Sequence, residues 1–335
     1  MNFSVGYQLC TDGRFTDAVL RNRESIAEVY FAYGDFPNGR NNTVINQELS
    51  KWLAAEKQQA DLRVINEAGI PLNLLLNGNC YGAEAQARTF FCKIGDTVDE
   101  LMGQYRLTSV TTTSPLIAKF IKQNFPALEV RASVNMEIGN PQSMDYIAEL
   151  FDSFYLKREY NRHFEKLQAA RQWCDKNGKK LYGLANSGCL NFCSVHNFHD
   201  NLVAHEAEIA TRDNAYQFDG QCRDYLRKKG DRWLEITNFI RPEDVPLYEG
   251  LFDGLKLATR VSRQFGRIID SYAKGSYRGN LPELLEPNHA DLFYPKVIEN
   301  KKIDPQFTGT TLHCDKNCAA CGYCEQVQKQ AEGEV

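Results

Sequence analysis

No apolar run in this 335-residue sequence approaches the roughly 20 consecutive residues that a helix needs to cross a bilayer. The first residues, MNFSVGYQLCTDGR, also lack the basic start and the apolar core of a secretory signal peptide. Both absences argue against a membrane-embedded or secreted protein. We therefore expect a cytoplasmic protein without a membrane span.

The sequence has no large excess of charge of one sign. Its formal net charge of -4 and its pI near 5.9 give no overall basic signature for nucleic acid, although a local basic groove is compatible with them. It contains neither the H-E-x-x-H helix of zinc proteases nor the G-x-S-x-G turn of serine hydrolases. The sequence therefore lacks the motifs of two common hydrolase mechanisms.

What the sequence does have is eleven cysteines, an odd number that fits poorly with a framework of disulfides. In a reducing compartment, clustered thiols hold metal more often than they form disulfides. Soft thiolate ligands suit an iron–sulfur cluster first and zinc second.

Four of these cysteines form a quartet near the C-terminus, CDKNCAACGYC, with Cys314, Cys318, Cys321 and Cys324. The spacing C-x3-C-x2-C-x2-C is close to, but not the same as, the bacterial ferredoxin run C-x2-C-x2-C-x3-C. Structural zinc sites usually separate two thiol pairs by a dozen residues or more, and this quartet has no such spacer. The spacing favours a cluster, with zinc and an absence of metal as the alternatives.

Upstream of the quartet, short apolar or β-branched runs alternate with helical patterns. The strand-like runs are 3–8, 28–33, 71–76, 107–112, 128–134, 152–157, 180–185 and 254–258, and the helix candidates are 46–67, 84–102, 114–124, 160–176 and 259–272. Runs such as VYFAY and LNLLL are apolar on both faces, as in parallel strands covered by helices. The alternation predicts an α/β fold of the TIM-like (β/α)8 type over residues 1–275, with an open doubly wound sheet as the alternative.

Two segments depart from this alternation. The first is a long loop at 187–232 that carries cysteines and histidines and is followed by a strand candidate at 233–238. Long loops inside compact domains are usually functional. The second is the C-terminal extension at 276–335, which ends in the cysteine quartet.

In a barrel the residues that follow the strands meet at one mouth, where TIM-barrel enzymes have their active sites. Four cysteines are placed to reach that mouth: Cys80, Cys189, Cys193 and Cys222. We expect them to hold a second metal centre, the alternative being packed thiols. His196 completes a C-x3-C-x2-H pattern and is either a ligand or a hydrogen-bonding group.

The C-x3-C-x2-H pattern also invites comparison with radical S-adenosylmethionine enzymes. In those enzymes a third cysteine stands where this sequence has His196, and the motif follows the first barrel strand rather than the seventh. Both differences argue against that family.

The central part of the chain resembles the peptidase U32 family. In one family passage a strand ends in Arg-Glu and a helix follows at once, and the segment FDSFYLKREYNRHFEKLQAAR is similar to it. A second passage, a strand leading to a small-residue turn and cysteines, is similar to LYGLANSGCLNFCSVH. A third, a Cys-Arg passage, is similar to CRDYL. ITNFIRPEDVPLYEGLFDGLKLATR is similar to a further block through Pro242, Asp244, Asp253, Lys256 and Arg260. The resemblance is strongest over 150–275.

The resemblance implies a barrel with an oxygen-sensitive [4Fe-4S] cluster. The better understood branches of that family support oxygen-independent hydroxylation of an aromatic ring in an RNA base or a small quinone precursor. Two departures matter here: the family's later cluster cysteine has no counterpart between Cys222 and Cys314, and the terminal quartet is an addition. The fourth ligand of the mouth cluster is therefore open between Cys80, a histidine and a tail cysteine.

Charged residues near the strand ends complete the predicted site. We expect Arg158, Lys256 and Arg260 to bind an anionic substrate group or to neutralise cluster charge, and Glu159 and Asp244 to transfer protons. The alternative is that all five form a buried ion-pair network.

Three functions are then in competition. The leading one is an iron–sulfur redox enzyme that acts on a small aromatic molecule or an RNA base and takes electrons from a donor such as a ferredoxin. The second is a non-catalytic electron-transfer or scaffold protein, with exposed clusters and no sizeable pocket at the strand ends. The third is a hydrolase or peptidase that uses a single zinc ion.

Overall fold

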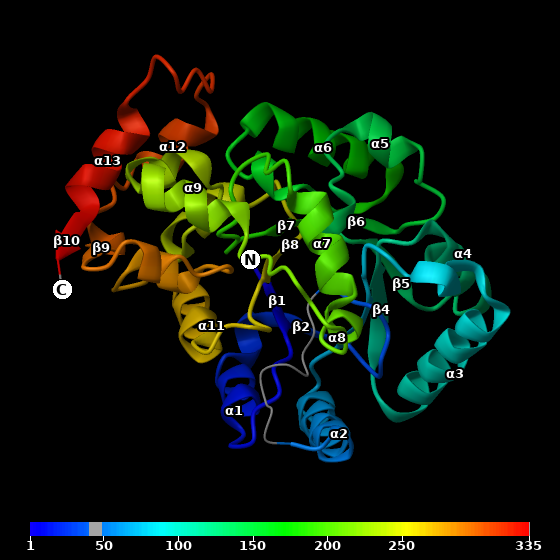
Figure 1. The fold of residues 1–335 in the computed structure, drawn as a ribbon. Helices are drawn as coiled ribbons and strands as arrows, with labels where there is room; N and C mark the ends of the chain where they lie inside the picture. The colour runs from blue at the N-terminus through cyan, green and yellow to red at the C-terminus, as the bar shows by residue number, and fades with distance from the viewer. Residues whose placement is uncertain (40–48, 335) are drawn as a thin grey trace.

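A closed eight-stranded parallel barrel forms the body of the protein in the computed structural model, which describes residues 1–39 and 49–334 (Figure 1). The strands pair in chain order, and β1 closes the barrel on β8. They are β1 (Phe3–Gly6), β2 (Ile26–Phe31), β3 (Leu72–Leu76), β4 (Leu107–Thr112), β5 (Glu129–Ala132), β6 (Ser153–Tyr155), β7 (Lys180–Leu184) and β8 (Gly254–Leu257). The predicted (β/α)8 class is confirmed, and the open sheet is excluded.

Helices cover the outside of the barrel (Figure 1). They are α1 (Arg14–Arg21), α2 (Lys51–Glu67), α3 (Arg88–Gln104), α4 (Pro115–Asn124), α5 (Pro141–Asp145), α6 (Phe164–Asn177) and α11 (Phe265–Lys274). The Ser114 side chain accepts a hydrogen bond from the Ile117 N–H, and proline follows it at the first helical position, as the sequence predicts for an N-cap. Residues 46–48 of the predicted helix 46–67 lie outside the described residues.

Several predicted helices begin later than the sequence pattern suggests, among them 84–102, which begins at Arg88, and two that follow β6 and β8. The predicted helix 160–176 begins at Phe164, because Arg158–Tyr160 form a separate 3-10 turn, η5, directly after β6. The predicted helix 259–272 begins at Phe265. In both places the residues between strand and helix stay at the mouth of the barrel, where their side chains can serve a site.

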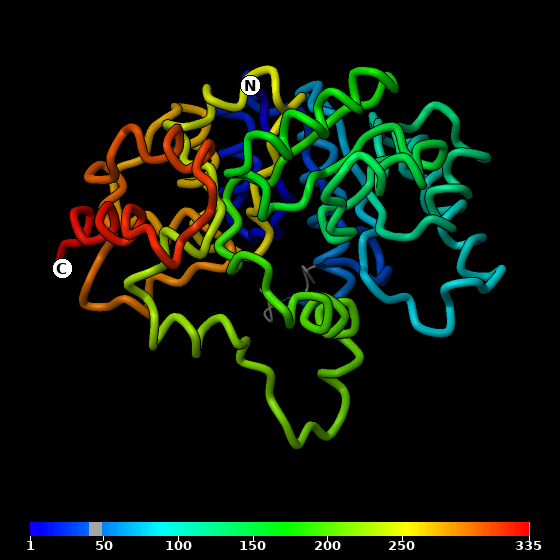
Figure 2. Tube along the Cα trace, turned by 90° about the horizontal axis from the view of Figure 1, so that it is seen from above, coloured from blue at the N-terminus to red at the C-terminus, as the bar shows by residue number. Residues whose placement is uncertain are grey.

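The long segment between β7 and β8 is largely helical. It contains α7 (His196–Ala204), α8 (Glu206–Ile209), α9 (Gln221–Lys229) and α10 (Trp233–Ile236), and part of it extends away from the barrel (Figure 2). The prediction of a strand at 233–238 is wrong. Residues Trp233–Ile236 form the helical turn α10, in which Trp233 and Leu234 are both buried.

The C-terminal extension packs against this segment. It holds η8 (Leu281–Leu284), β9 (Lys296–Ile298), α12 (Phe307–Leu312), α13 (Tyr323–Ala331) and β10 (Glu332–Glu334), and β10 pairs antiparallel with β9. The Gln328 side chain in α13 accepts from the Leu234 N–H at 3.0 Å and donates to the Gly230 carbonyl at 2.6 Å. The cysteine quartet, which runs from just after α12 into the first turn of α13, is thereby fixed beside α10.

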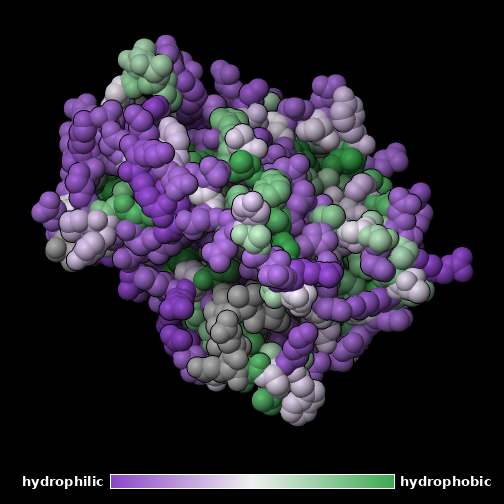
Figure 3. Space-filling model, viewed as in Figure 1, coloured by the Kyte–Doolittle hydropathy of each residue, from purple (hydrophilic) through white to green (hydrophobic). Residues whose placement is uncertain are grey.

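The surface seen from the side of Figure 1 is mostly hydrophilic, with separate hydrophobic patches (Figure 3). Among the described residues, no helix is both long and apolar enough to cross a membrane.

The interior of the barrel is polar and centres on one ion pair. Arg131 of β5 and Glu28 of β2 are 3% and 5% exposed, and Nη1 lies 2.6 Å from Oε1. Glu28 also accepts hydrogen bonds from three neighbouring strands, through Ser4, Asn73 and Ser109. Arg131 donates in addition to Ser153 of β6 and to Glu129 of its own strand. One network therefore joins strands β1 to β6.

We expect Arg131→Met to lower the free energy of unfolding by about 3–5 kcal/mol, because it leaves the Glu28 carboxylate buried without its charge partner. Urea unfolding followed by circular dichroism measures this. The matched control is Arg21→Gln, since Arg21 pairs with Asp270 at 3.0 Å but is 57% exposed, and such pairs contribute about 0–1 kcal/mol. Equal losses in the two variants would contradict a central role for the buried pair.

The pKa of Glu129 predicts that the same network stabilises the fold less at acidic pH. Burial raises the pKa of Glu129, but Arg131, Lys180 and Ser153 outweigh it and bring the pKa to about 2. Because the folded pKa lies below the ordinary glutamate value of 4.5, the contribution of Glu129 to stability is complete above pH 4.5 and is lost as the pH falls towards 2. Glu129→Gln should therefore be less stable than the native chain at pH 7, and the difference should shrink on acidification. A constant difference between pH 7 and pH 3 would argue against this linkage.

Candidate functional site

Three adjacent strands deliver the predicted site residues to one side of the barrel mouth. Arg158 and Glu159 follow β6, Cys189 follows β7, and Lys256 lies near the end of β8. Because β6, β7 and β8 are neighbours in the barrel, these residues share one sector of the mouth.

Three of the four cysteines predicted for the mouth lie in one neighbourhood. Burial raises the pKa of the Cys222 thiol, and the nearby Cys189 and Cys193 raise it further. Repulsion between thiolates falls with distance, so Cys189 and Cys193 both lie within electrostatic range of the Cys222 sulfur. The helical segment after β7 brings Cys222 back to the turn that carries the other two.

Arg158 is held against this thiol group by a chain of hydrogen bonds. Its Nη1 donates to the Cys189 sulfur at 3.5 Å, and its Nη2 contacts His196 Nε2. His196 Nδ1 lies 2.7 Å from Glu137 Oε1. His196 Nε2 is also 3.3 Å from the Asp200 carboxylate, one turn further along α7. Arg158, His196 and Asp200 are all buried.

These contacts favour one of the two predicted roles of His196. Both ring nitrogens already have protein partners, Nδ1 at Glu137 and Nε2 at Arg158 and Asp200. This arrangement is that of a hydrogen-bonding group that orients Arg158, and the role as a metal ligand stays a prediction.

Cys80, the fourth predicted ligand, has different neighbours. Its sulfur accepts from the Gly82 N–H at 3.4 Å, and hydrogen bonds from His205 and Gly82 lower the pKa of the thiol. His205 Nδ1 lies 3.5 Å from a Glu208 carboxylate oxygen. The structure thus places Cys80 with α8 and not in contact with the Cys189 group.

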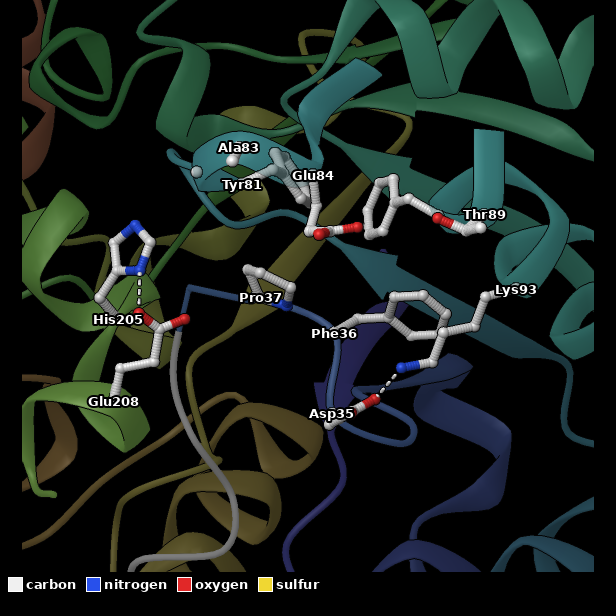
Figure 4. A pocket seen from close by; sticks show the side chains of 12 residues that line it. Asp35, Phe36, Pro37, Tyr81, Ala83, Glu84, Thr89, Lys93, His205 and Glu208 are labelled. Atoms are coloured by element: carbon white, nitrogen blue, oxygen red, sulfur yellow. Dashed lines mark hydrogen bonds and ion pairs between the residues drawn. The ribbon is translucent and has the colours of Figure 1, made fainter. Parts of the chain in front are cut away.

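A cavity of about 530 Å³ opens beside His205 and Glu208 (Figure 4). It lies past the ends of β2 and β3, and aromatic side chains line much of it: Phe36, Tyr81 and Phe90. On the side opposite His205, Lys93 pairs with Asp35 (Figure 4). A sizeable pocket at the strand ends is the feature that separates the enzyme prediction from the scaffold prediction.

The four cysteines of the tail also form one group. Burial raises the pKa of Cys318, and Cys314 and Cys321 contribute. Burial raises the pKa of Cys324 to about 11, with Cys318 and Cys314 adding to the rise and Arg162 opposing it. Cys314 and Cys321 are exposed, so one edge of the group faces solvent.

Arg162 is a buried cation beside the tail thiols. It is 2% exposed, donates to the Leu234 carbonyl at 2.8 Å and lies over the ring of Phe307. It stands four residues after Arg158, in the same connection between β6 and α6. One short segment, Arg158–Arg162, therefore places a cation at each thiol group.

Backbone strain is concentrated at these two groups. In the described part of the chain, three non-glycine residues have positive φ: Glu137 (52°), Phe192 (51°) and Lys316 (61°). Phe192 lies between Cys189 and Cys193, Lys316 lies between Cys314 and Cys318, and Glu137 orients His196. Such strain costs about 1–3 kcal/mol per residue and accumulates at functional sites.

The two predicted proton-transfer residues have unlike surroundings. Glu159 is 3% exposed, and its Oε2 accepts no hydrogen bond and lies 3.9 Å from Lys157 Nζ. Asp244 pairs with Arg241 at 2.7 Å and accepts from Thr308 at 2.6 Å. Asp244 therefore ties α12 to the barrel, whereas Glu159 retains a free acceptor near the mouth.

Over residues 1–39 and 49–334, no three His, Cys, Asp or Glu side chains are placed so that they could hold a metal ion together. The donor chemistry of the two thiol groups suits a soft metal, since several sulfurs lie in each neighbourhood beside a cation.

Sequence reasoning missed three residues that the structure places here. Asp200 stands four residues after His196, a spacing that puts both on one face of α7 and was readable in advance. Arg162 stands four residues after Arg158, but its contact with the tail depends on how the extension folds back. Glu137 gave no signal, because its contact with His196 joins distant segments.

The chain is similar in sequence to one known protein and in fold to one solved structure, as follows. No family model matches the chain. A protein of Methanocaldococcus jannaschii named as an uncharacterized protease is 29% identical over 230 residues, covering 67% of this chain and 66% of that protein. The chain thus spans about two thirds of the length of the curated relative that it matches.

The solved structure of the U32 peptidase Mk0906 superposes with a TM-score of 0.56 at 14% identity, over 76% of this chain and 91% of the other. At this identity the likeness shows the fold. With the sequence relative, it confirms the resemblance to the peptidase U32 family that the sequence predicts.

Proposed function

We propose that this protein is an iron–sulfur enzyme of the U32 type that carries out an oxygen-independent, hydroxylation-like modification of an aromatic ring. The observation that carries the proposal is the pairing of two thiol groups with the two arginines of one segment, Arg158 at Cys189 and Arg162 near Cys324. Cationic donors against thiolates stabilise cluster charge and tune its potential.

Cys189, Cys193 and Cys222 would hold the mouth cluster, and Cys314, Cys318, Cys321 and Cys324 the tail cluster. Cys80 is the proposed fourth mouth ligand and would have to leave His205 to serve. A bound [4Fe-4S] cluster would supply one-electron redox chemistry. The tail, exposed at Cys314 and Cys321, would exchange electrons with a redox partner such as a ferredoxin, which would have to take up the two electrons that hydroxylation with oxygen from water removes from the ring.

This chain's own residues would bind and orient the substrate. Phe192 is 59% exposed beside Cys193, and Lys157 Nζ lies 5.3 Å from the centre of its ring. An exposed ring flanked by a cation offers a stacking surface for a planar aromatic substrate with negative charge. That chemistry covers both an RNA base and a small aromatic acid.

Glu159 would hold or accept a proton at its free Oε2, next to the substrate's position at the strand ends. His196 and Glu137 would keep Arg158 on the Cys189 sulfur while the charge of the site changes. The buried Asp200 carboxylate, close to His196, limits the positive charge of that group.

The scaffold alternative retains one supporting observation, the solvent-exposed edge of the tail group. The cavity of about 530 Å³ at the strand ends favours an enzyme instead.

Anaerobic purification followed by iron, sulfide and zinc quantification tests the proposal. We expect about eight irons per chain in the native protein and about four in Cys321→Ser and in Cys189→Ser, because each variant loses one cluster. Cys80→Ser measures the fourth ligand: a loss of about four irons makes Cys80 a ligand, and unchanged iron removes it from the set. Zinc near one equivalent with negligible iron would defeat the redox proposal.

A second expectation separates positioning from ligation at His196. His196→Gln should retain the native iron content, since His196 is proposed to orient Arg158 and not to bind iron. It should nevertheless change the midpoint potential of the mouth cluster in an anaerobic redox titration, because the Arg158 donor to Cys189 loses its support. The control is His313→Gln, which should move neither quantity. Loss of iron in His196→Gln would make His196 a ligand.

A further inference from the structure

Lys256 is a buried amine without a polar partner. It lies in β8 and is 7% exposed, yet its Nζ forms no hydrogen bond or ion pair within the described ranges 1–39 and 49–334. Its nearest partners are aromatic faces: Nζ lies 4.0 Å from the centre of the Tyr30 ring and 5.3 Å from that of Tyr155. Ring contacts replace only part of the hydration that a buried ammonium loses.

The charges around Lys256 do not supply the missing partner. Burial lowers its pKa to about 7, with Arg260 and Arg131 adding to the fall and Glu28 and Glu286 opposing it. Glu28 is already bound by Arg131 and three neutral donors. A substantial fraction of Lys256 is therefore an uncharged amine with a free lone pair near neutral pH.

Arg260 stands beside this amine for a structural reason. Gly6 of β1 faces both Arg260 and Tyr30, and a Cβ there would lie 2.6 Å from Arg260 Cγ and 2.7 Å from the Tyr30 ring. The absence of a side chain at Gly6 lets Arg260 and Tyr30 cross the inside of β1. Arg260 Nη1 also donates to the Asn38 side chain at 3.1 Å. A fixed guanidinium thus accompanies the amine at the reactive end of the barrel.

We propose that Lys256 Nζ is a nucleophile that forms an imine with a small carbonyl compound bearing a carboxylate or phosphate, which Arg260 binds. The nitrogen lone pair attacks the carbonyl carbon, and the carbonyl oxygen takes up a proton. The resulting carbinolamine loses water, which leaves a C=N bond to Nζ. No electrons are exchanged, so the step needs no oxidant or reductant.

This inference goes beyond the iron–sulfur proposal and does not depend on it. Imine formation at Lys256 requires only the amine, the anion site and access from the mouth. Iron content and imine formation are measured separately on the same anaerobic sample, so either proposal can fail alone.

Borohydride trapping tests the inference directly. The full-length protein is incubated at pH 7 with glyoxylate, which has an aldehyde and a carboxylate, and the imine is reduced to a stable secondary amine. Peptide mass spectrometry then locates the adduct. We expect labelling of Lys256 to exceed that of the exposed Lys119 at least about tenfold, because only the buried amine is substantially unprotonated at this pH.

Acetaldehyde, which lacks the carboxylate, is the matched probe. Lys256 should react with it about tenfold less than with glyoxylate, since Arg260 has no charge to bind. Arg260→Gln should remove that preference, so that glyoxylate and acetaldehyde label Lys256 equally. Labelling by acetaldehyde should itself fall, because loss of a neighbouring cation raises the Lys256 pKa, and labelling that still exceeds that of Lys119 shows the variant to be folded. Labelling of Lys256 should fall as the pH is lowered through about 7. No adduct at Lys256, or equal labelling of Lys119, would overturn the proposal.

Discussion

The buried ion pair between Arg131 and Glu28 is the constraint on which the barrel depends. Barrels of this class usually fill their interior with layers of branched apolar side chains. Here the layer at this level is built of charges and hydroxyl groups, and one carboxylate collects donors from four other strands. A buried carboxylate accepts hydrogen bonds only at defined directions, so the network fixes strand register as well as strand proximity.

The ion pair also acts at a distance on the mouth of the barrel. Glu28 and Arg131 are both among the charges that set the pKa of Lys256. Arg131 repels the Lys256 ammonium and so offsets part of the attraction that Glu28 exerts on it. The structural network below and the reactive amine above are therefore parts of one electrostatic system, and a change at Arg131 would alter the protonation of Lys256 as well as stability.

The connection after β6 has an equally central position for the thiol groups. Arg158 faces the mouth cysteines from the first position of the 3-10 turn Arg158–Tyr160, and Arg162, two residues beyond the turn, faces the tail cysteines. A displacement of this turn at one thiol group would be transmitted to the other through four residues of backbone. If both groups hold clusters, their relative position is set here and not by the extension alone.

The sequence allowed the strands to be placed because VYFAY and LNLLL are covered on both faces, and it allowed the tail quartet to be found because its spacing is local. It could not show that Glu28 meets Arg131, since 103 residues separate them. Nor could it show that Glu137 meets His196 or that Arg162 lies beside the tail cysteines. Residues 233–238 were read as a strand because a short apolar run carries no period, and the packing of α10 on α13 decided the matter.

Arg131 and Lys256 show how the same interior treats two cations in opposite ways. Arg131 is almost completely buried and stays charged, because two carboxylates and several hydroxyl groups surround it. Lys256 is buried to a similar degree, but its contacts are tyrosine faces, and neither Glu28 nor Glu286 forms an ion pair with it among the described residues. A fold that needed a bulky group at this position for packing alone would gain more from leucine or methionine, which carry no charge to desolvate. The amine is unfavourable for stability unless a ligand uses it, and this imbalance is the physical reason to look for that ligand at the end of β8.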